Sequence, residues 1–309
     1  MNFKNIIFVL IVILFIFQII VTKESKKEKA DNSKPLVALS TFSLYDVAKH
    51  ISGDSIKLIM ILPFGVDAHS FEPTPKLMAD IDRSDLVVYS GAGLEPWIDG
   101  FEFKNRVINM SEHVRLREMN PDAHHHGHHH KNHNSIDPHY WQDIENMVLV
   151  TNLISEELIK ISPKNRELYL NNRDNYVKML KKLDNDYRSS LSTCQGDTII
   201  VNHNAFSYLA NNYNFSVEAL SGLSPEAQPS AKNMIKLIEH VKEHNISTIF
   251  FESFVSDKAI KNIAAEAKVS VDILQPLGNI TADEADKNLT FEDIMRMNLD
   301  KISKAMKCQ

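Results

Sequence analysis

From residue 36 to the C-terminus, apolar runs of strand length alternate with amphipathic stretches of helix length. This alternation is typical of parallel β-sheets whose faces are covered by helices, because each parallel strand needs a crossover connection. The chain has 309 residues, which is enough for about two such units. The sequence therefore predicts an α/β protein of two lobes, each built on a parallel sheet flanked by helices.

The two halves of the chain contain similar series of predicted elements. In the first half we expect strands at 36–40, 55–62, 86–90 and 106–109, and helices at 42–51 and 75–83. In the second half we expect strands at 197–201, 216–220, 248–251 and 269–274, and helices at 205–213, 230–243, 257–267 and 291–306. No Gly-x-Gly-x-x-Gly sequence follows any of these strands, so nucleotide binding is not supported.

Two long amphipathic stretches between the halves predict consecutive helices at 140–161 and 165–191. Pro163 lies between them, where it suits the start of a helix. At 1.5 Å per residue the second helix is about 40 Å long, which is enough to pack against both halves. We therefore expect a long linking helix and three regions: an N-terminal lobe at 35–140, connecting helices at 141–193 and a C-terminal lobe at 194–309.

The N-terminal segment 1–22 contains an apolar run, residues 6–21, that only Gln18 interrupts. As a helix this run is about 24 Å long, slightly short for a bilayer and slightly long for a signal-peptide core. A cleaved signal peptide and an uncleaved membrane anchor therefore both remain open. Residues 23–34 are rich in Lys and Glu and are expected to form a charged tether. The body of the protein is expected to be periplasmic or otherwise extracytoplasmic.

Cysteine content and charge exclude several classes of protein. Two cysteines are too few for a disulfide scaffold or a Cys-based zinc module. An oxidising compartment would allow Cys194 and Cys308 to pair, although the sequence leaves their separation open. The formal net charge of −6 disfavours a nucleic-acid partner.

Histidine is unusually frequent, with 14 residues, and seven of these lie between His124 and His133. They belong to a polar stretch, 123–134, which we name the His-rich loop. Tracts of this kind bind transition metals. Capture or sensing of metal is one hypothesis for the loop, and an insertion without function is the alternative.

Three further histidines follow predicted strands or begin a helix. His69 lies after the strand at 55–62, His203 directly after the strand at 197–201, and His139 at the start of the first connecting helix. Ligands of open α/β sheets bind beyond the carboxyl ends of the strands. Imidazole nitrogen is a common ligand of Zn²⁺. The three side chains could converge on a metal in the cleft between the lobes, although ordinary loop or helix-cap roles also fit the pattern.

Several segments resemble one family throughout, and they occur in the family's order: GVDAHSFEPTP, DPHYWQD, VNHNAFSYLA, LSPEAQPSAKNM and FFESFVSDKAIKNIA. The chain resembles the metal-binding solute-binding proteins of ABC transporters (cluster A-I), and most closely the periplasmic zinc-uptake type. The likeness extends over about residues 36–307. It implies a two-lobed fold with a rigid linking helix, a metal in the cleft and delivery of that metal to a membrane permease.

The resemblance also implies a ligand set. It places the family's three ligands at His69, His139 and His203. Relatives selective for manganese have a carboxylate at the third position and an Asp before the last helix, where this chain has His203 and Leu289. The all-nitrogen set favours Zn²⁺ as bound substrate. Water or a carboxylate from an expected flexible loop would complete it, the carboxylate candidates being Asp283, Glu284 and Asp286.

The predicted function is therefore a monomeric extracytoplasmic binding protein that captures Zn²⁺ and passes it to an ABC permease, and not an enzyme. The alternatives are a Mn²⁺- or Fe²⁺-binding member of the family, a metal-binding adhesin, and a zinc hydrolase, because three histidines with an open position also occur in catalytic sites. Glu226 and Glu252 lie in family-like motifs and are expected to contact the transporter, cap a helix or form a core hydrogen bond. Tyr140 and Trp141 either wall the cleft or only pack.

Overall fold

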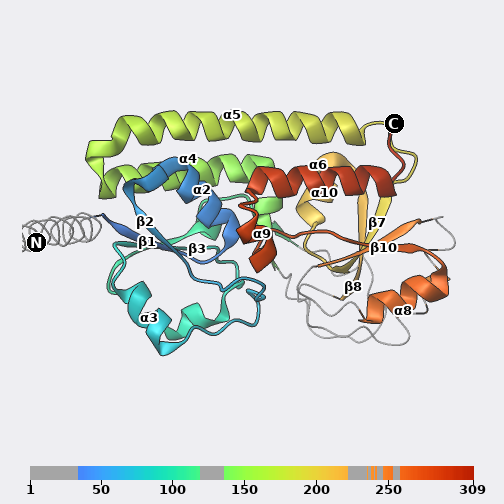
Figure 1. Ribbon diagram of the computed structural model, residues 1–309, viewed down its shortest axis with the longest axis horizontal. Coiled ribbons are helices and arrows are strands. Elements are labelled where there is room, and N and C mark those ends of the chain that lie inside the picture. The colour runs from blue at the N-terminus through green and yellow to red at the C-terminus, as the bar shows by residue number, and fades with distance from the viewer. Residues whose placement is uncertain are drawn as a thin grey trace, which may run out of the picture.

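The computed structural model describes residues 34–118, 136–221, 235, 238, 239, 241, 246–252 and 258–309. The predicted N-terminal segment 1–22, nearly all of the tether, the His-rich loop, Glu226 and most of the helix at 230–243 lie outside the described residues. Two parallel sheets lie side by side beneath one long helix (Figure 1). None of the described helices has the length and apolar character needed to cross a membrane.

The first sheet has the strand order β2-β1-β3-β4 and is entirely parallel. Its strands are β1 (Leu36–Leu39), β2 (Lys57–Met60), β3 (Leu86–Tyr89) and β4 (Arg106–Asn109), and its helices are α2 (Phe42–Ser52) and α3 (Pro75–Asp82). The strands β1 and β3 are almost continuously apolar and buried, as expected when helices and loops cover both faces of a parallel sheet. Gly53 ends α2 with a φ of 53°, a value that glycine adopts without strain.

The second sheet has the strand order β10-β9-β7-β8 and is also parallel. Its strands are β7 (Thr198–His203), β8 (Ser216–Ser221), β9 (Thr248–Phe251) and β10 (Ser270–Ile273), and the helices that follow them include α6 (Ser207–Tyr213), α8 (Lys258–Ala267) and α10 (Phe291–Ala305). The predicted fold class is confirmed. The described elements of both sheets lie within two residues of the predicted bounds.

The connecting helices are α4 (Ile144–Ile161) and α5 (Arg166–Leu191). The prediction of one continuous helix from residue 140 was wrong, because a short 3₁₀ turn (Tyr140–Gln142) comes first. Asp143 then stands in extended conformation and its carboxylate accepts a hydrogen bond from the Glu145 backbone N–H, which starts α4 afresh. Another 3₁₀ turn (Pro163–Asn165) separates α4 from α5.

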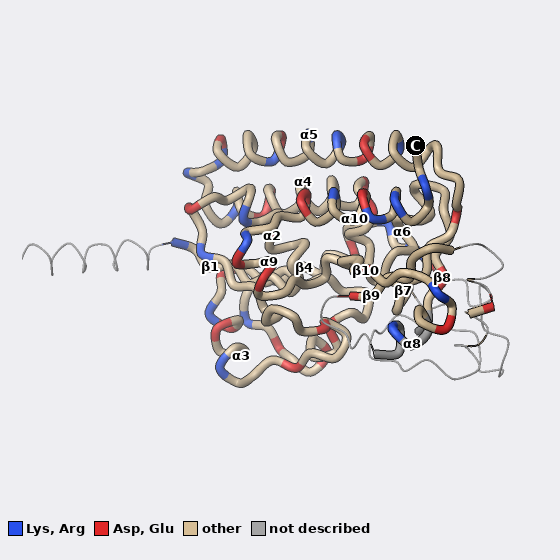
Figure 2. Tube along the Cα trace, turned by 45° about the vertical axis from the view of Figure 1, so that its right-hand side comes forward, with Lys and Arg blue, Asp and Glu red and all other residues tan. Residues whose placement is uncertain are grey.

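Helix α5 spans both halves of the molecule and packs against helices from each (Figure 1). The Tyr176 hydroxyl donates to the Asp46 carboxylate on α2 at 2.8 Å, and the Tyr187 hydroxyl donates to the Met295 carbonyl on α10 at 2.6 Å. Acidic and basic residues are interspersed along α5, as Figure 2 shows, and some pair one turn apart, such as Arg188 with Asp184. The helix therefore links the two sheets through one shared apolar core.

Short elements complete the described chain. A two-stranded antiparallel ladder joins β5 (Arg117–Glu118) to β6 (Ile136–Asp137), on either side of the segment that holds the His-rich loop. Further 3₁₀ turns are Gly53–Ser55, Pro96–Gly100 and Met110–Glu112. The loop expected to be flexible before the last helix instead contains α9 (Ala282–Asp286), which a capping box between Thr281 and Glu284 starts.

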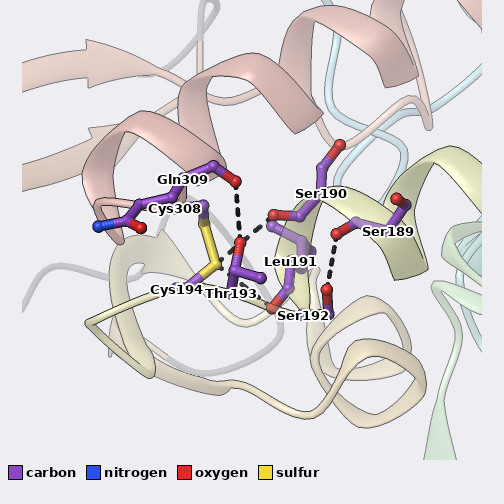
Figure 3. The surroundings of a disulfide bond; sticks show 8 residues. All are labelled: Ser189, Ser190, Leu191, Ser192, Thr193, Cys194, Cys308 and Gln309. Carbon is purple, nitrogen blue, oxygen red and sulfur yellow. Dashed lines mark hydrogen bonds between the residues drawn. A yellow bond between two sulfur atoms is a disulfide. The ribbon is translucent and has the colours of Figure 1, made fainter.

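Cys194 and Cys308 form a disulfide bond across 114 residues (Figure 3). Cys194 follows the end of α5, and Cys308 follows α10. Beside the bond, the Thr193 hydroxyl donates to the Gln309 carbonyl at 2.9 Å. The bond therefore ties the C-terminal end of the chain to the end of the linking helix.

The double variant Cys194→Ser/Cys308→Ser should have a free energy of unfolding about 2–4 kcal/mol below that of the wild type, because the bond restricts the unfolded chain. Urea unfolding without reductant measures this difference. Reductant should lower the wild-type midpoint and leave the double variant unchanged. A wild-type midpoint that stays constant after verified reduction would contradict the prediction.

Candidate metal centre

Three histidines meet from three separate segments of the fold. His69 lies in the loop between β2 and α3, His139 lies between β6 and the 3₁₀ turn that precedes α4, and His203 is the last residue of β7. His203 was expected just after its strand, but β7 continues through it and pairs it with Ser221 of β8. The backbone of this histidine is thus fixed by the sheet itself.

The three imidazoles face one another through their Nε2 atoms. The His69 and His139 Nε2 atoms lie 3.3 Å apart, and those of His139 and His203 lie 3.4 Å apart. Each of the three residues offers a nitrogen within 4.8 Å of the others. Two ligands of a tetrahedral zinc ion, each about 2.05 Å from the metal, are roughly 3.3 Å apart. The spacing is therefore that of nitrogens that share one small cation.

Buried carboxylates orient two of these rings from behind. The Asp137 carboxylate lies 2.8 Å from Nδ1 of His139 and also accepts the His139 backbone N–H. The Glu252 carboxylate also contacts Nδ1 of His203. All four of these side chains are at most 3% exposed. A neutral imidazole that donates its Nδ1–H to a carboxylate presents the Nε2 lone pair on the opposite side, as metal-binding histidines do.

The environment of Asp137 keeps it charged. Burial alone would raise the pKa of this carboxyl, but hydrogen bonds from His139 and from the Ser207 hydroxyl outweigh burial and lower its pKa. Asp137 belongs to the sequence IDPH, two residues before His139, and was not among the predicted site residues. The sequence signal that could have identified Asp137 is a carboxylate only two residues before a candidate metal ligand.

Both halves of the chain line the pocket around the Nε2 atoms. Its wall includes Leu94 and Trp141 from the first half and Pro276, Gly278 and Asn279 from the second. The Trp141 indole N–H donates to the Pro276 carbonyl at 2.7 Å. A hydrogen bond therefore joins the two parts of the pocket wall. Of the two roles left open for these residues, Trp141 lines the pocket, whereas Tyr140 is fully buried and is not part of the lining.

The three carboxylates considered as a fourth ligand lie on α9 and do not line the pocket. The Glu284 carboxylate accepts hydrogen bonds from the Thr281 backbone N–H and the Gln275 side chain. Asp283 pairs with Lys287 at the surface. Glu252 lies in the core, since it is 1% exposed and contacts His203.

His69 differs electrostatically from an exposed histidine. Burial lowers the pKa of its imidazole to about 3, and the nearby imidazoles of His139 and His203 act in the same direction. The ring therefore stays neutral well below pH 6.5, and a neutral ring is the form that coordinates metal.

Two α/β units, each built on a parallel sheet, and a pocket of converging imidazoles define the class of this protein. It is a metal-binding solute-binding protein. A sequence model of the family described as "Zinc-uptake complex component A periplasmic" matches residues 37–305. The chain belongs to this family, and the predicted membership is confirmed.

Individual relatives agree with this assignment. The chain is 32% identical over 292 residues to the high-affinity zinc uptake system protein ZnuA of Bacillus subtilis, covering 92% of this chain and 91% of that protein. The laminin-binding protein Lmb of Streptococcus agalactiae, described as a bifunctional protein with adhesin and metal transporting activity, has a TM-score of 0.78 at 28% identity and covers 88% of this chain and 99% of its own. The Zn(II)-bound ZnuA-like domain of Streptococcus pneumoniae AdcA has a TM-score of 0.75 at 26% identity, with coverage of 89% and 99%.

The lowered pKa of His69 predicts how the metal-free protein responds to acid. The unfolded chain binds a proton at His69 as the pH falls through 6.5, whereas the folded chain remains neutral there down to about pH 3. Stability should therefore fall with pH across this window. The unfolded His69→Gln variant cannot bind this proton. Between pH 7 and 5 its free energy of unfolding should therefore fall less than that of the wild type, and the difference between the two losses should be about 1–2 kcal/mol.

Urea unfolding of chelator-treated protein at both pH values measures the difference. Equal losses of stability in the wild type and the variant would show that His69 titrates normally in the folded state.

Proposed function

We propose that His69, His139 and His203 together ligate one Zn²⁺ ion, and that the chain is the extracytoplasmic component that captures this ion and hands it to an ABC transporter permease. The observation that best supports this proposal is the convergence of the three Nε2 atoms. The Nε2 atom of His139 lies 3.3 Å from that of His69 and 3.4 Å from that of His203. The family's description and the zinc-binding relatives support the same cargo.

The donor set favours zinc over manganese or iron. Three imidazole nitrogens suit Zn²⁺, whereas Mn²⁺ is better served by carboxylate and water oxygens. Among the described residues, the carboxylates of Asp137 and Glu252 are engaged with the Nδ1 atoms. Asp67, which also lines the pocket, accepts a hydrogen bond from the Ser70 hydroxyl. Water is therefore the proposed fourth ligand.

The same two carboxylates argue against a zinc hydrolase. A hydrolase needs a general base that can reach the metal-bound water. Asp137 and Glu252 lie behind the imidazole rings and orient them, so each is on the wrong side of its ring for this role. Asp67, the other carboxylate in the pocket lining, accepts the Ser70 hydroxyl. We therefore propose that the protein binds and releases zinc without transforming a substrate.

The arrangement of the chain fits a carrier. We propose lobes at residues 35–140 and 194–309, joined by connecting helices at 141–193, with the protein acting as a monomer. The N-terminal segment 1–22 would export the chain or tether it to the membrane, and the His-rich loop would collect metal near the pocket. The adhesin activity of Lmb belongs to that relative and has no matching observation in the described residues of this chain.

Each of the variants His69→Ala, His139→Ala and His203→Ala should weaken zinc binding by about 100-fold or more, since zinc sites gain roughly 3 kcal/mol per ligand. Competition against a chromophoric chelator measures this affinity in the full-length chain, and counts only sites tight enough to compete with the chelator. Weak binding by the His-rich loop should persist in all three variants.

The matched control is His113→Ala, which removes an exposed histidine outside the pocket lining and should leave tight binding unchanged. Full affinity in any one of the three pocket variants would remove that residue from the ligand set. The wild type should bind one zinc tightly per chain and show no turnover of ester or peptide substrates.

A further inference from the structure

One of the three imidazoles is held differently from the other two. Within the described residues, no carboxylate forms a hydrogen bond or ion pair with His69, and its ring contacts only the imidazoles of His139 and His203. His69 also belongs to a stretch between β2 and α3 that contains no helix or strand. Its position must therefore be set by whatever fixes this loop.

The base of the loop is bonded to a segment from the other half of the chain. The Asn279 amide donates through Nδ2 to the Pro63 carbonyl at 2.6 Å and to the Val66 carbonyl at 2.8 Å. Beside it, the Gly65 backbone N–H donates to the Ile280 carbonyl at 2.9 Å. Asn279 thus holds the turn at 63–66 at two points, three residues before His69.

The Asn279 side chain is itself fixed in orientation. It is 2% exposed, and its Oδ1 accepts the backbone N–H of Ile280 at 2.8 Å. With Oδ1 occupied, both hydrogens of Nδ2 are directed at the two loop carbonyls. The amide therefore uses both of its donors, and no shorter or apolar side chain could replace both.

The segment that carries Asn279 is also bonded next to His139. The Pro276 carbonyl accepts hydrogen bonds from the Trp141 indole and the Gln142 amide, each at 2.7 Å. Two residues further on, the Gly278 carbonyl accepts the Phe42 backbone N–H at 2.9 Å. One short segment therefore contacts both the neighbours of His139 and the loop of His69, and so sets the spacing between those two imidazoles.

We propose that Asn279 is a positioning residue of the metal site: by bridging the Pro63 and Val66 carbonyls it holds the His69 loop at the spacing from His139 that a shared cation needs. This inference rests on the proposed zinc site. Asn279 does not touch the metal and acts only through His69. Without the amide, the turn at 63–66 keeps its own Val66-to-Pro63 hydrogen bond but loses two of its bonds to the segment from the second half.

The Asn279→Ala variant should bind zinc about 10-fold more weakly than the wild type, the size of effect seen when groups behind a metal ligand are removed. The matched control is Asn105→Ala. Asn105 also donates through Nδ2 to two backbone carbonyls, those of Ile81 and Ser84, but it precedes β4 and so lies at the opposite edge of the first sheet from His69. This control should lose stability without losing zinc affinity.

A double-mutant cycle with His69→Ala tests whether Asn279 affects zinc affinity through His69. If Asn279 acts through His69, adding Asn279→Ala to His69→Ala should change the zinc affinity less than about 2-fold. The same tenfold loss in both backgrounds would overturn the proposal, because it would show a general loosening of the pocket. Chelator competition on the full-length chain measures all four proteins, and urea unfolding confirms that each is folded.

The cycle also separates this proposal from the proposed function. Full affinity in His69→Ala would overturn the ligand assignment, and with it the role of Asn279. A large loss in His69→Ala combined with wild-type affinity in Asn279→Ala would leave the ligand set standing and overturn the positioning role alone. If Asn279→Ala does not fold, Asn279→Ser, which retains one donor, should give a smaller loss of affinity in the same cycle.

Discussion

The pocket depends on holding three imidazoles with their Nε2 atoms directed at one point. Such an arrangement is unfavourable unless each ring is held in place, because adjacent lone pairs repel and a proton on any ring would repel a metal. Asp137 and Glu252 supply this fixation for His139 and His203 through Nδ1. His69 is kept neutral by burial and is placed by its loop.

The scaffold provides these fixed points at the carboxyl ends of two parallel sheets. His203 ends β7 and its partner Glu252 directly follows β9, and these two strands are neighbours in the second sheet. His69 follows β2 of the first sheet. Helix α5 fixes the two sheets relative to each other, because Tyr176 bonds α2 and Tyr187 bonds α10. A site shared between two sheets therefore rests on the helix that contacts both.

Much of the fold could be predicted because periodicity and breaker residues report on local structure. The described strands and helices of both sheets lie within two residues of the predicted bounds, since their apolar runs and Gly or Pro boundaries are clear. The 3₁₀ turn before α4 was missed because Asp143 is a weak signal inside an otherwise helical pattern. The two-residue strands β5 and β6 are too short to show a period.

The site was harder to predict because orientation depends on contacts between distant residues. The sequence could single out three histidines at the ends of predicted elements, but it could not show that Glu252 lies behind His203 or that Asn279 bridges Pro63 and Val66. These pairs are separated by 49 residues or more, and only the sheet order and the segment at 276–281 bring them together.

The position of that segment connects the proposed ligands to the rest of the fold. One stretch of chain contacts the start of α2, the turn before His69 and the side chains after His139, and it then enters α9 and α10, which packs on α5. Any shift of the second sheet relative to the first would therefore move the residues that set the distance between His69 and His139. A pocket built in this way binds its ion tightly only when both halves are correctly placed, which is the property that a carrier with ligands from two lobes requires.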